Sequence, residues 1–271
     1  MILLLSGYWE FFGLRFKRIY VLASTLILAT ILLLKIFSFQ PVEQNIYLSA
    51  FISVLQIYLL FQMIKILIVI TKPDKGATEI EFPFKNGKYL ITDGGNSKIS
   101  RLMNYHYYSP IHKKNKTNRS MLYATDIVKL PGSNSNFFPL QNEDYPIFGE
   151  KVYSPISGVV IKVENGIPDN IPYSGNYPYN TGNTIVIRNV NKYLLLGHLK
   201  KESIKVNLGD KVNARDLIAE AGNSGYSERP HIHIQLIEST TDNYWKGLGI
   251  SMLFMGKNLY KNKIIDILHI A

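Results

Sequence analysis

The chain has 271 residues, a net charge of +10 and no cysteine. Without thiols it cannot hold a disulfide framework, zinc bound by thiolates, or a cysteine nucleophile. The positive charge favours anionic partners such as lipid headgroups or wall polymers, but nucleic acid is not expected, because the sequence has no Arg-rich run and no nucleic-acid-binding motif.

The first quarter of the chain is strongly apolar. Residues 1–18 are rich in aromatic side chains and end in positive charges, which is typical of a segment lying in a membrane interface. Residues 19–39 and 44–70 are apolar runs, each interrupted by one lysine. Both exceed the about 20 residues that a membrane-spanning helix needs. The sequence therefore predicts a two-helix transmembrane hairpin over 19–70 with the lipid bilayer as partner. Two buried helices of a soluble protein are the alternative.

From residue 71 onward the composition changes to short β-type runs separated by Gly- and Asn-containing turns. We interpret 71–95 as a linker and first strand, and 96–271 as one domain with a C-terminal extension. No helical period of comparable strength occurs there, so a mostly β domain is expected. The expected strands include SGVVIKVENG (157–166), NTIVIRNV (183–190), KYLLLGHL (192–199) and HIHIQLIE (231–238).

The segment HIHIQL has the pattern of a strand that carries polar side chains on one face. His231 and His233 alternate with isoleucines, so both imidazoles would lie on one face and the isoleucines on the core face. Two imidazoles side by side suit zinc, which binds imidazole nitrogen at about 2.0–2.1 Å. Two surface histidines on an antiparallel strand are the alternative.

Two further polar residues end or interrupt apolar runs. Asp126 lies in SMLYATDIVKL, where a buried carboxylate needs a partner, either a metal or an arginine or helix cap. His198 lies in LLLGHL, where it is either part of a site or a core histidine bonded to backbone.

Together these segments resemble the LytM/lysostaphin-type zinc endopeptidases, which cut bacterial peptidoglycan. The resemblance covers roughly residues 96–236, a little over half of the chain. The matching text is YATDI at Asp126, VYSPISGVVIKV, GNTIVI, LLLGHL and IKVNLGDKVNARDLIAEAGNSGYSERPHIHIQL.

The resemblance implies an antiparallel β-sheet domain with zinc as cofactor. Asp126 and His233 would be zinc ligands, and His198 and His231 would be the catalytic pair that positions water and stabilises the oxyanion. Three protein ligands would leave the fourth zinc position open.

One position departs from the family pattern. The common first ligand is a histidine four residues before the aspartate, and Leu122 stands there. Some family members place this histidine further upstream, beyond an inserted loop. His106 and His112 are the candidates, and we favour His106 because His112 borders a basic loop.

The sequence thus predicts a membrane-anchored zinc metalloendopeptidase acting on peptidoglycan stem peptides or cross-bridges. An inert LytM-like domain that binds a protein partner or wall polymer is the first alternative, because of Leu122. A biotinyl- or lipoyl-type carrier is the second, but no modifiable lysine at a hairpin tip is identified.

The expected location is a multi-pass membrane protein with its catalytic domain outside the cytoplasm. A wall hydrolase must face outward, whereas the basic residues at both ends of the hairpin favour the cytoplasmic side.

Overall fold

A computed structural model describes residues 22–23, 26–27, 29–30, 46–71, 74–101, 103–108, 118–130, 139–175, 177–178 and 180–267. The predicted interfacial segment 1–18 and the alternative ligand His112 lie outside the described residues, as does most of the first apolar run, 19–39.

The described residues are mostly β, with one long helix, which confirms the predicted class of the domain. The helix is α2 (Ile46–Thr71), and the single-turn 3-10 helices are η3 (His106–Tyr108), η4 (Arg119–Met121), η5 (Asn142–Asp144) and η6 (Tyr244–Lys246). The strands are β1 (Thr78–Glu79), β2 (Gly87–Asp93), β3 (Thr125–Lys129), β4 (Lys151–Tyr153), β5 (Gly158–Glu164), β6 (Asn183–Asn189), β7 (Lys192–Leu199), β8 (Lys211–Val212), β9 (Leu217–Glu220), β10 (Ile232–Glu238), β11 (Leu248–Ile250), β12 (Met252–Phe254), β13 (Lys257–Asn258) and β14 (Ile264–Ile267).

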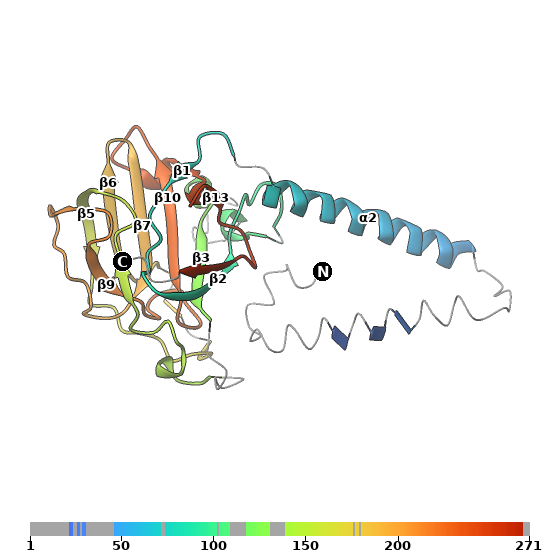
Figure 1. The fold of residues 1–271 in the computed structure, drawn as a ribbon, viewed down its shortest axis with the longest axis horizontal. Helices are drawn as coiled ribbons and strands as arrows, with labels where there is room; N and C mark the ends of the chain where they lie inside the picture. The colour runs from blue at the N-terminus through green and yellow to red at the C-terminus, as the bar shows by residue number, and fades with distance from the viewer. Residues whose placement is uncertain are drawn as a thin grey trace.

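A large antiparallel sheet organises the domain (Figure 1). Its strand order is β14-β2-β3-β10-β7-β6-β5-β8, and β11 pairs with β10 outside this path. The smaller sheets are β1-β12-β13 and β4-β9. The C-terminal strand β14 therefore forms one edge of the sheet, beside β2. Strand β10, which carries the HIHIQL motif, lies between β3 and β7.

The hydrophobic core lies on the face of β10 opposite His233. Ile232, Ile234 and Leu236 alternate into this core and are almost completely buried. Burial of each such side chain is worth about 1.5–3 kcal/mol. Because side chains alternate along a strand, His233 and Gln235 are held on the other face. The core therefore fixes the register of the strand and, with it, the face that carries the site.

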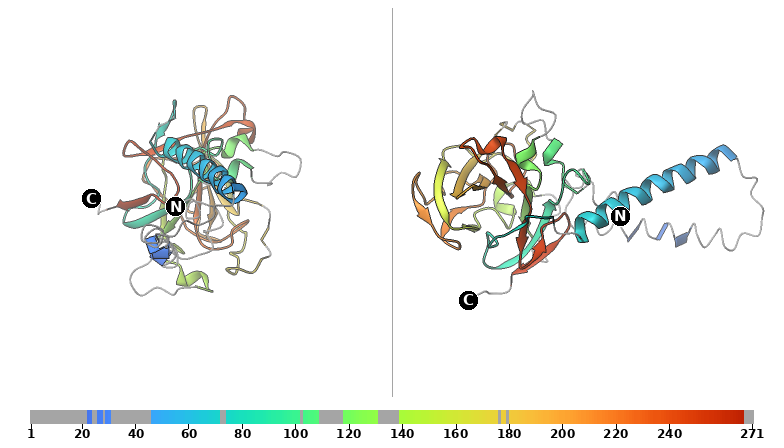
Figure 2. Two further views of the ribbon diagram at one scale, coloured as in Figure 1. Left: turned by 90° about the vertical axis from the view of Figure 1, so that its right-hand side faces the viewer. Right: turned by 90° about the horizontal axis from the view of Figure 1, so that it is seen from above.

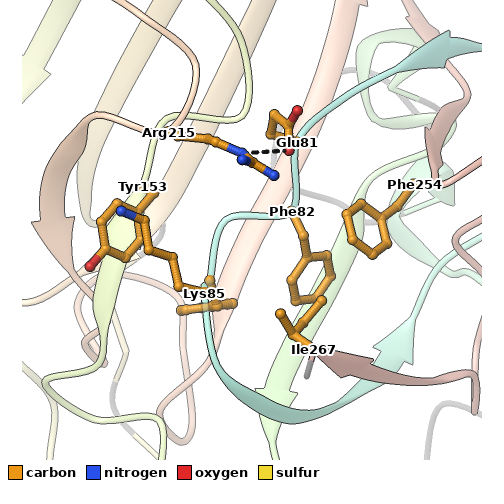
Figure 3. A pocket seen from close by; sticks show the side chains of 8 residues that line it. Glu81, Phe82, Lys85, Tyr153, Arg215, Phe254 and Ile267 are labelled. Carbon is orange, nitrogen blue, oxygen red and sulfur yellow. Dashed lines mark hydrogen bonds and ion pairs between the residues drawn. The ribbon is translucent and has the colours of Figure 1, made fainter. Parts of the chain in front are cut away.

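A pocket opens beside this core, where the segment between β1 and β2 passes the sheet (Figure 3). Phe82 and Phe254 line it, with ring centroids 5.1 Å apart. At its rim Arg215 Nε donates to Glu81 Oε2 over 3.1 Å. No histidine lines this pocket, so it is separate from the candidate metal centre.

Helix α2 projects away from the sheet (Figures 1 and 2). Within the described part of the chain, no helix combines the length and the apolar character needed to cross a bilayer. The end of α2 belongs to the domain, because Ile66 and Val69 are buried in a cluster with Met103. The sequence predicts that these two side chains face lipid within a membrane-spanning helix, whereas they pack in the domain. The predictions of a two-helix transmembrane hairpin over 19–70 and of a multi-pass membrane location are therefore wrong, and insertion into a lipid bilayer as partner is not supported.

Candidate metal centre

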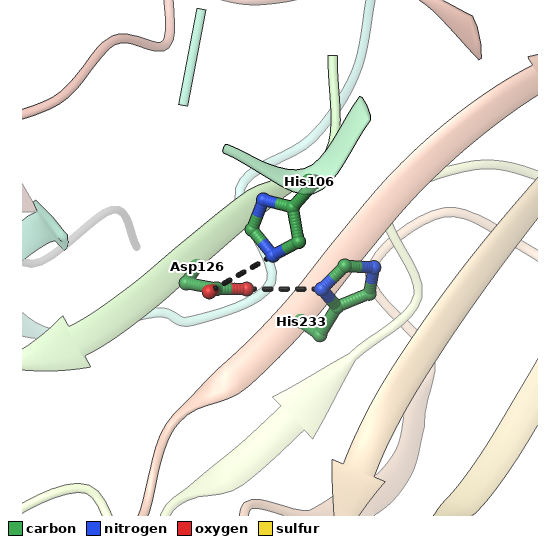
Figure 4. Close-up of side chains that lie close together, drawn as sticks. All are labelled: His106, Asp126 and His233. Carbon is green, nitrogen blue, oxygen red and sulfur yellow. Dashed lines mark hydrogen bonds and ion pairs between the residues drawn. The ribbon is translucent and has the colours of Figure 1, made fainter. Parts of the chain in front are cut away.

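Three predicted ligands converge on one point of the polar face of the sheet (Figure 4). Strands β3 and β10 pair so that Asp126 lies directly opposite His233. His106 reaches the same place from η3. One ligand atom from each of the three residues lies within 4.8 Å of the others, and all three are buried. The structure thus brings together residues separated by up to 127 positions of sequence (233 − 106).

The carboxylate of Asp126 contacts both of the other residues in the cluster. Its Oδ2 lies 3.2 Å from His106 Nε2, and its Oδ1 lies 2.9 Å from His233 Nδ1. His231 Nε2 is more distant, at 3.8 Å from Oδ1. The distances separate His106 and His233, which contact the carboxylate directly, from His231, which does not.

The outward nitrogen of each contacting ring is held by an oxygen acceptor. His106 Nδ1 lies 2.9 Å from Asn104 Oδ1, and His233 Nε2 lies 3.0 Å from Gln235 Oε1. Because these oxygens accept, each outward nitrogen carries the proton and donates it. When a metal is bound, the inward nitrogens, His106 Nε2 and His233 Nδ1, would offer their lone pairs to it beside Asp126. This tautomer pattern is the one that metal-binding histidines adopt.

The electrostatics of the cluster favour a cation. Burial by itself lowers the pKa of His106, but the attraction of Asp126 and Asp93 outweighs it and raises that pKa to about 10. Burial raises the pKa of Asp126, but His106 and His231 hold it well below its usual range. Without a metal, Asp126 therefore stays ionised and His106 stays protonated. A divalent cation would take the place of that proton, since histidine must be neutral to bind a metal.

His198 reaches the site through an irregularity in β7. Leu194 and Leu196 point into the core, so strict alternation would send His198 there as well. His198 instead has a φ of +60°, and the pairing of β6 with β7 shifts register at this point. Leu199 therefore occupies the core, and the His198 ring lies with its centroid 4.7 Å from that of His231.

The other two histidines of the described residues form a pair of neutral rings. His198 Nδ1 lies 2.8 Å from the Ser224 carbonyl oxygen, and His231 Nδ1 lies 2.9 Å from the Arg229 carbonyl oxygen. A carbonyl only accepts, so each Nδ1 donates and each Nε2 is unprotonated. Burial lowers the pKa of His198 well below its usual range and also lowers the pKa of His231. Both rings are therefore neutral at neutral pH, with an unprotonated Nε2 that a proton can reach.

Comparison with known proteins finds a family match for part of the chain. Residues 144–244 match the model of Peptidase family M23. The chain contains an M23 peptidase domain. The predicted resemblance to LytM/lysostaphin-type enzymes is thereby confirmed.

Individual relatives each match part of the chain. An uncharacterized metalloprotease of Buchnera aphidicola is 34% identical over 106 residues, which cover 38% of this chain and 26% of that protein. The peptidoglycan DD-endopeptidase ShyA of Vibrio cholerae is 35% identical over 89 residues, which cover 33% and 18%. The catalytic domain of lysostaphin from Staphylococcus simulans superposes with a TM-score of 0.31 at 20% identity, covering 49% of this chain and 76% of that one. The chain thus matches about a quarter or less of the length of both sequence relatives.

The M23 match contains only part of the site. His198, His231 and His233 lie within residues 144–244, whereas His106 and Asp126 lie upstream of the match. Leu122, which stands where the family usually has a ligand, is buried, and its carbonyl oxygen accepts a hydrogen bond from the Ser97 N–H. His106 is the upstream histidine that the structure places beside Asp126.

Residues not singled out in the sequence also take part. Asp93 Oδ2 lies 3.0 Å from His106 Nδ1, and Gln235 fixes the orientation of His233. Asp93 had the same sequence signal as Asp126, an acid that ends an apolar β-type run, here YLITD. It was missed because it lies outside the segments on which the family resemblance rests.

The backbone around Gly225, which positions the residue that holds His198, packs closely against the backbone at Gly182. A Cβ on Gly225 would overlap the backbone nitrogen of Gly182, and Gly225 has a φ of +76°. The neighbouring Ser224 provides the carbonyl that holds His198. Gly225→Ala is therefore expected to lower the free energy of unfolding by more than about 2 kcal/mol, measured by denaturant titration.

Gly166→Ala is the matched control for this prediction. A Cβ at Gly166 meets no atom within 4 Å, and the residue does not have a positive φ. The change should alter the unfolding free energy by less than about 1 kcal/mol, in either direction. Equal destabilisation by both variants would show that the Gly182–Gly225 approach is unimportant.

Proposed function

We propose that this chain is a zinc-dependent endopeptidase that hydrolyses peptide bonds in peptidoglycan stem peptides or cross-bridges. The observation that carries the proposal is the convergence of His106, Asp126 and His233, with the inward nitrogen of each ring facing the carboxylate. The neutral pair His198 and His231 beside this cluster supplies the groups that peptide hydrolysis needs in addition to a metal.

The donor set fits zinc. Two imidazole nitrogens and one carboxylate match the donor types of catalytic zinc sites, which use three protein ligands and keep one position open. No thiolate is available in the chain, and a calcium site would be built from oxygen donors. When bound, zinc supplies Lewis acidity that polarises a carbonyl and lowers the pKa of water.

The chain's own residues handle the proton. His231 Nε2 lies 3.8 Å from Asp126 Oδ1, beside the proposed centre. Its Nδ1–H donates to the Arg229 carbonyl and lies 3.2 Å from Ser227 Oγ. It is the group we assign to accept a proton from the attacking water. His198 is held in the same way by the Ser224 carbonyl, and its ring centroid lies 4.7 Å from that of His231. Once either ring is protonated it can donate to the developing oxyanion.

The substrate class is proposed from similarity and charge. One relative of the matched segment is named as a peptidoglycan DD-endopeptidase. The net charge of +10 favours association with an anionic polymer such as a bacterial wall.

Each chain should bind one zinc ion, and the bound ion should stabilise the fold. Because the ligands come from β3, β10 and η3, an ion bound only by the native state raises the unfolding free energy by about 2.7 kcal/mol at 100 times its dissociation constant. We expect a chelator to lower the melting temperature and zinc to restore it. Asp126→Asn should show no response to either reagent, and a parent protein equally unresponsive would contradict the proposed centre.

Hydrolysis itself tests the proposal. Purified zinc-loaded protein, incubated with peptidoglycan, should release new amino groups at a rate that falls on chelation and recovers with zinc. The second candidate function is a binding domain without activity, favoured by Leu122 at the family's usual ligand position. Stoichiometric zinc with retained wall binding but no new amino groups would favour that alternative.

A further inference from the structure

A buried ion pair lies behind the candidate metal centre, outside the segment that matches the M23 family. Lys261 Nζ lies 3.3 Å from Asp93 Oδ1, and neither side chain is exposed to solvent. The other carboxylate oxygen of Asp93 lies 3.0 Å from His106 Nδ1. The carboxylate thus connects a lysine of the C-terminal segment to the ring that faces Asp126.

Asp93 reaches this position through a bulge. Tyr89 and Ile91 of β2 point into the core, and strict alternation would place Asp93 there too. The pairing of β2 with β3 shifts register between Ile91 and Asp93, which places Asp93 opposite Asp126. Bulges of this kind redirect a side chain at the cost of regular pairing.

The C-terminal segment provides Lys261, the positively charged member of this ion pair. Strand β14 pairs with β2, and Lys261 precedes it in the turn where Asn262 N–H donates to the Ile91 carbonyl. Burying an unpaired lysine or aspartate would be costly, so each charge requires the other in this place. A pair of apolar residues would fill the same space without that cost, which indicates that the charges serve another purpose.

We propose that Asp93, paired with Lys261, is a positioning residue for His106. The proposal rests on the proposed zinc centre. The Asp93 carboxylate accepts the His106 Nδ1–H together with Asn104 Oδ1 and also accepts the backbone N–H of Tyr105 over 3.2 Å. It thereby fixes both the ring and the backbone that carries it, and directs His106 Nε2 toward Asp126. The strands on either side of the M23 segment complete the centre that the segment itself lacks.

The main test is the double variant Asp93→Leu/Lys261→Met, which removes both charges together and leaves no buried ion unpaired. In the metal-free protein we expect the parent to show a protected ring N–H resonance, assigned to His106 by its absence in His106→Ala. The double variant should shift this resonance and speed its exchange with water, because only Asn104 Oδ1 remains to accept the Nδ1–H. Zinc affinity, measured by chelator competition, should fall about 10–100-fold, and the visible spectrum of the cobalt-loaded protein should shift.

Two further variants make the outcome specific. Asp93→Asn/Lys261→Met keeps an acceptor for His106 without the charges, and should recover the ring resonance and part of the zinc affinity. Lys88→Met removes an exposed ion pair with Asp266, 3.0 Å long, between the same strands β2 and β14, and should match the parent.

A ring resonance, zinc affinity and cobalt spectrum that are unchanged in the Asp93→Leu/Lys261→Met variant would overturn the proposal, even if that variant melts at a lower temperature. The resonance is read without metal, so it decides the role of Asp93 independently. A parent protein that binds no zinc would instead contradict the proposed function.

Discussion

His233→Ala should abolish both zinc binding and peptide hydrolysis. His233 Nδ1 lies 2.9 Å from Asp126 Oδ1, and its outward nitrogen is held by Gln235, so the substitution removes one of the three proposed ligands. Loss of a ligand should weaken zinc binding by more than the about 10–100-fold that loss of an outer hydrogen-bond partner costs. Metal analysis after dialysis, together with the amino-group release assay, measures both effects.

The same measurement identifies the first ligand. His106→Ala should behave like His233→Ala, because His106 Nε2 lies 3.2 Å from Asp126 Oδ2. His112→Ala, the other upstream candidate from the sequence, should bind zinc like the parent. If His112→Ala loses zinc and His106→Ala keeps it, the assignment of the ligand is wrong. If neither variant loses zinc, the proposed three-residue centre is wrong.

His231→Ala should lose activity while keeping zinc. His231 Nε2 lies 3.8 Å from Asp126, beyond direct contact, and its neutral ring is placed to accept a proton. General acid–base groups typically contribute about 10²–10⁴-fold to the rate. We expect a fall of this size in kcat/KM, with stoichiometric zinc and a cobalt spectrum close to that of the parent.

His198→Ala should give the same separation of activity from metal content. Its ring lies beside that of His231, and its Nδ1–H is anchored to the Ser224 carbonyl, so we assign it no ligand role. Because His198 and His231 act on the same proton and the same oxyanion, the double variant should lose less than the product of the single losses. Zinc loss in either single variant would show that the roles of ligand and proton acceptor have been exchanged.

The sequence by itself determined the class of the domain and most of the candidate site. Alternation in HIHIQL predicted that the isoleucines face the core and that His233 lies on the polar face, and the structure has this arrangement. It succeeded because a one-residue shift in register would turn the histidines into the hydrophobic core and the isoleucines onto the polar face, which makes the register strongly specified. Asp126 and His198 were found as polar residues in apolar runs, since such residues need a buried partner.

Only the tertiary structure decided which residues meet. Alternation alone sends Asp93 and His198 into the core, and two local irregularities, a register shift in β2 and a positive φ in β7, bring them to the site. Such irregularities depend on how neighbouring strands pair, and a single strand's pattern does not contain that information. The end of α2 was misread for a related reason. Hydropathy measures the preference of a side chain for a nonpolar environment, but Ile66 and Val69 find that environment against Met103 of their own domain.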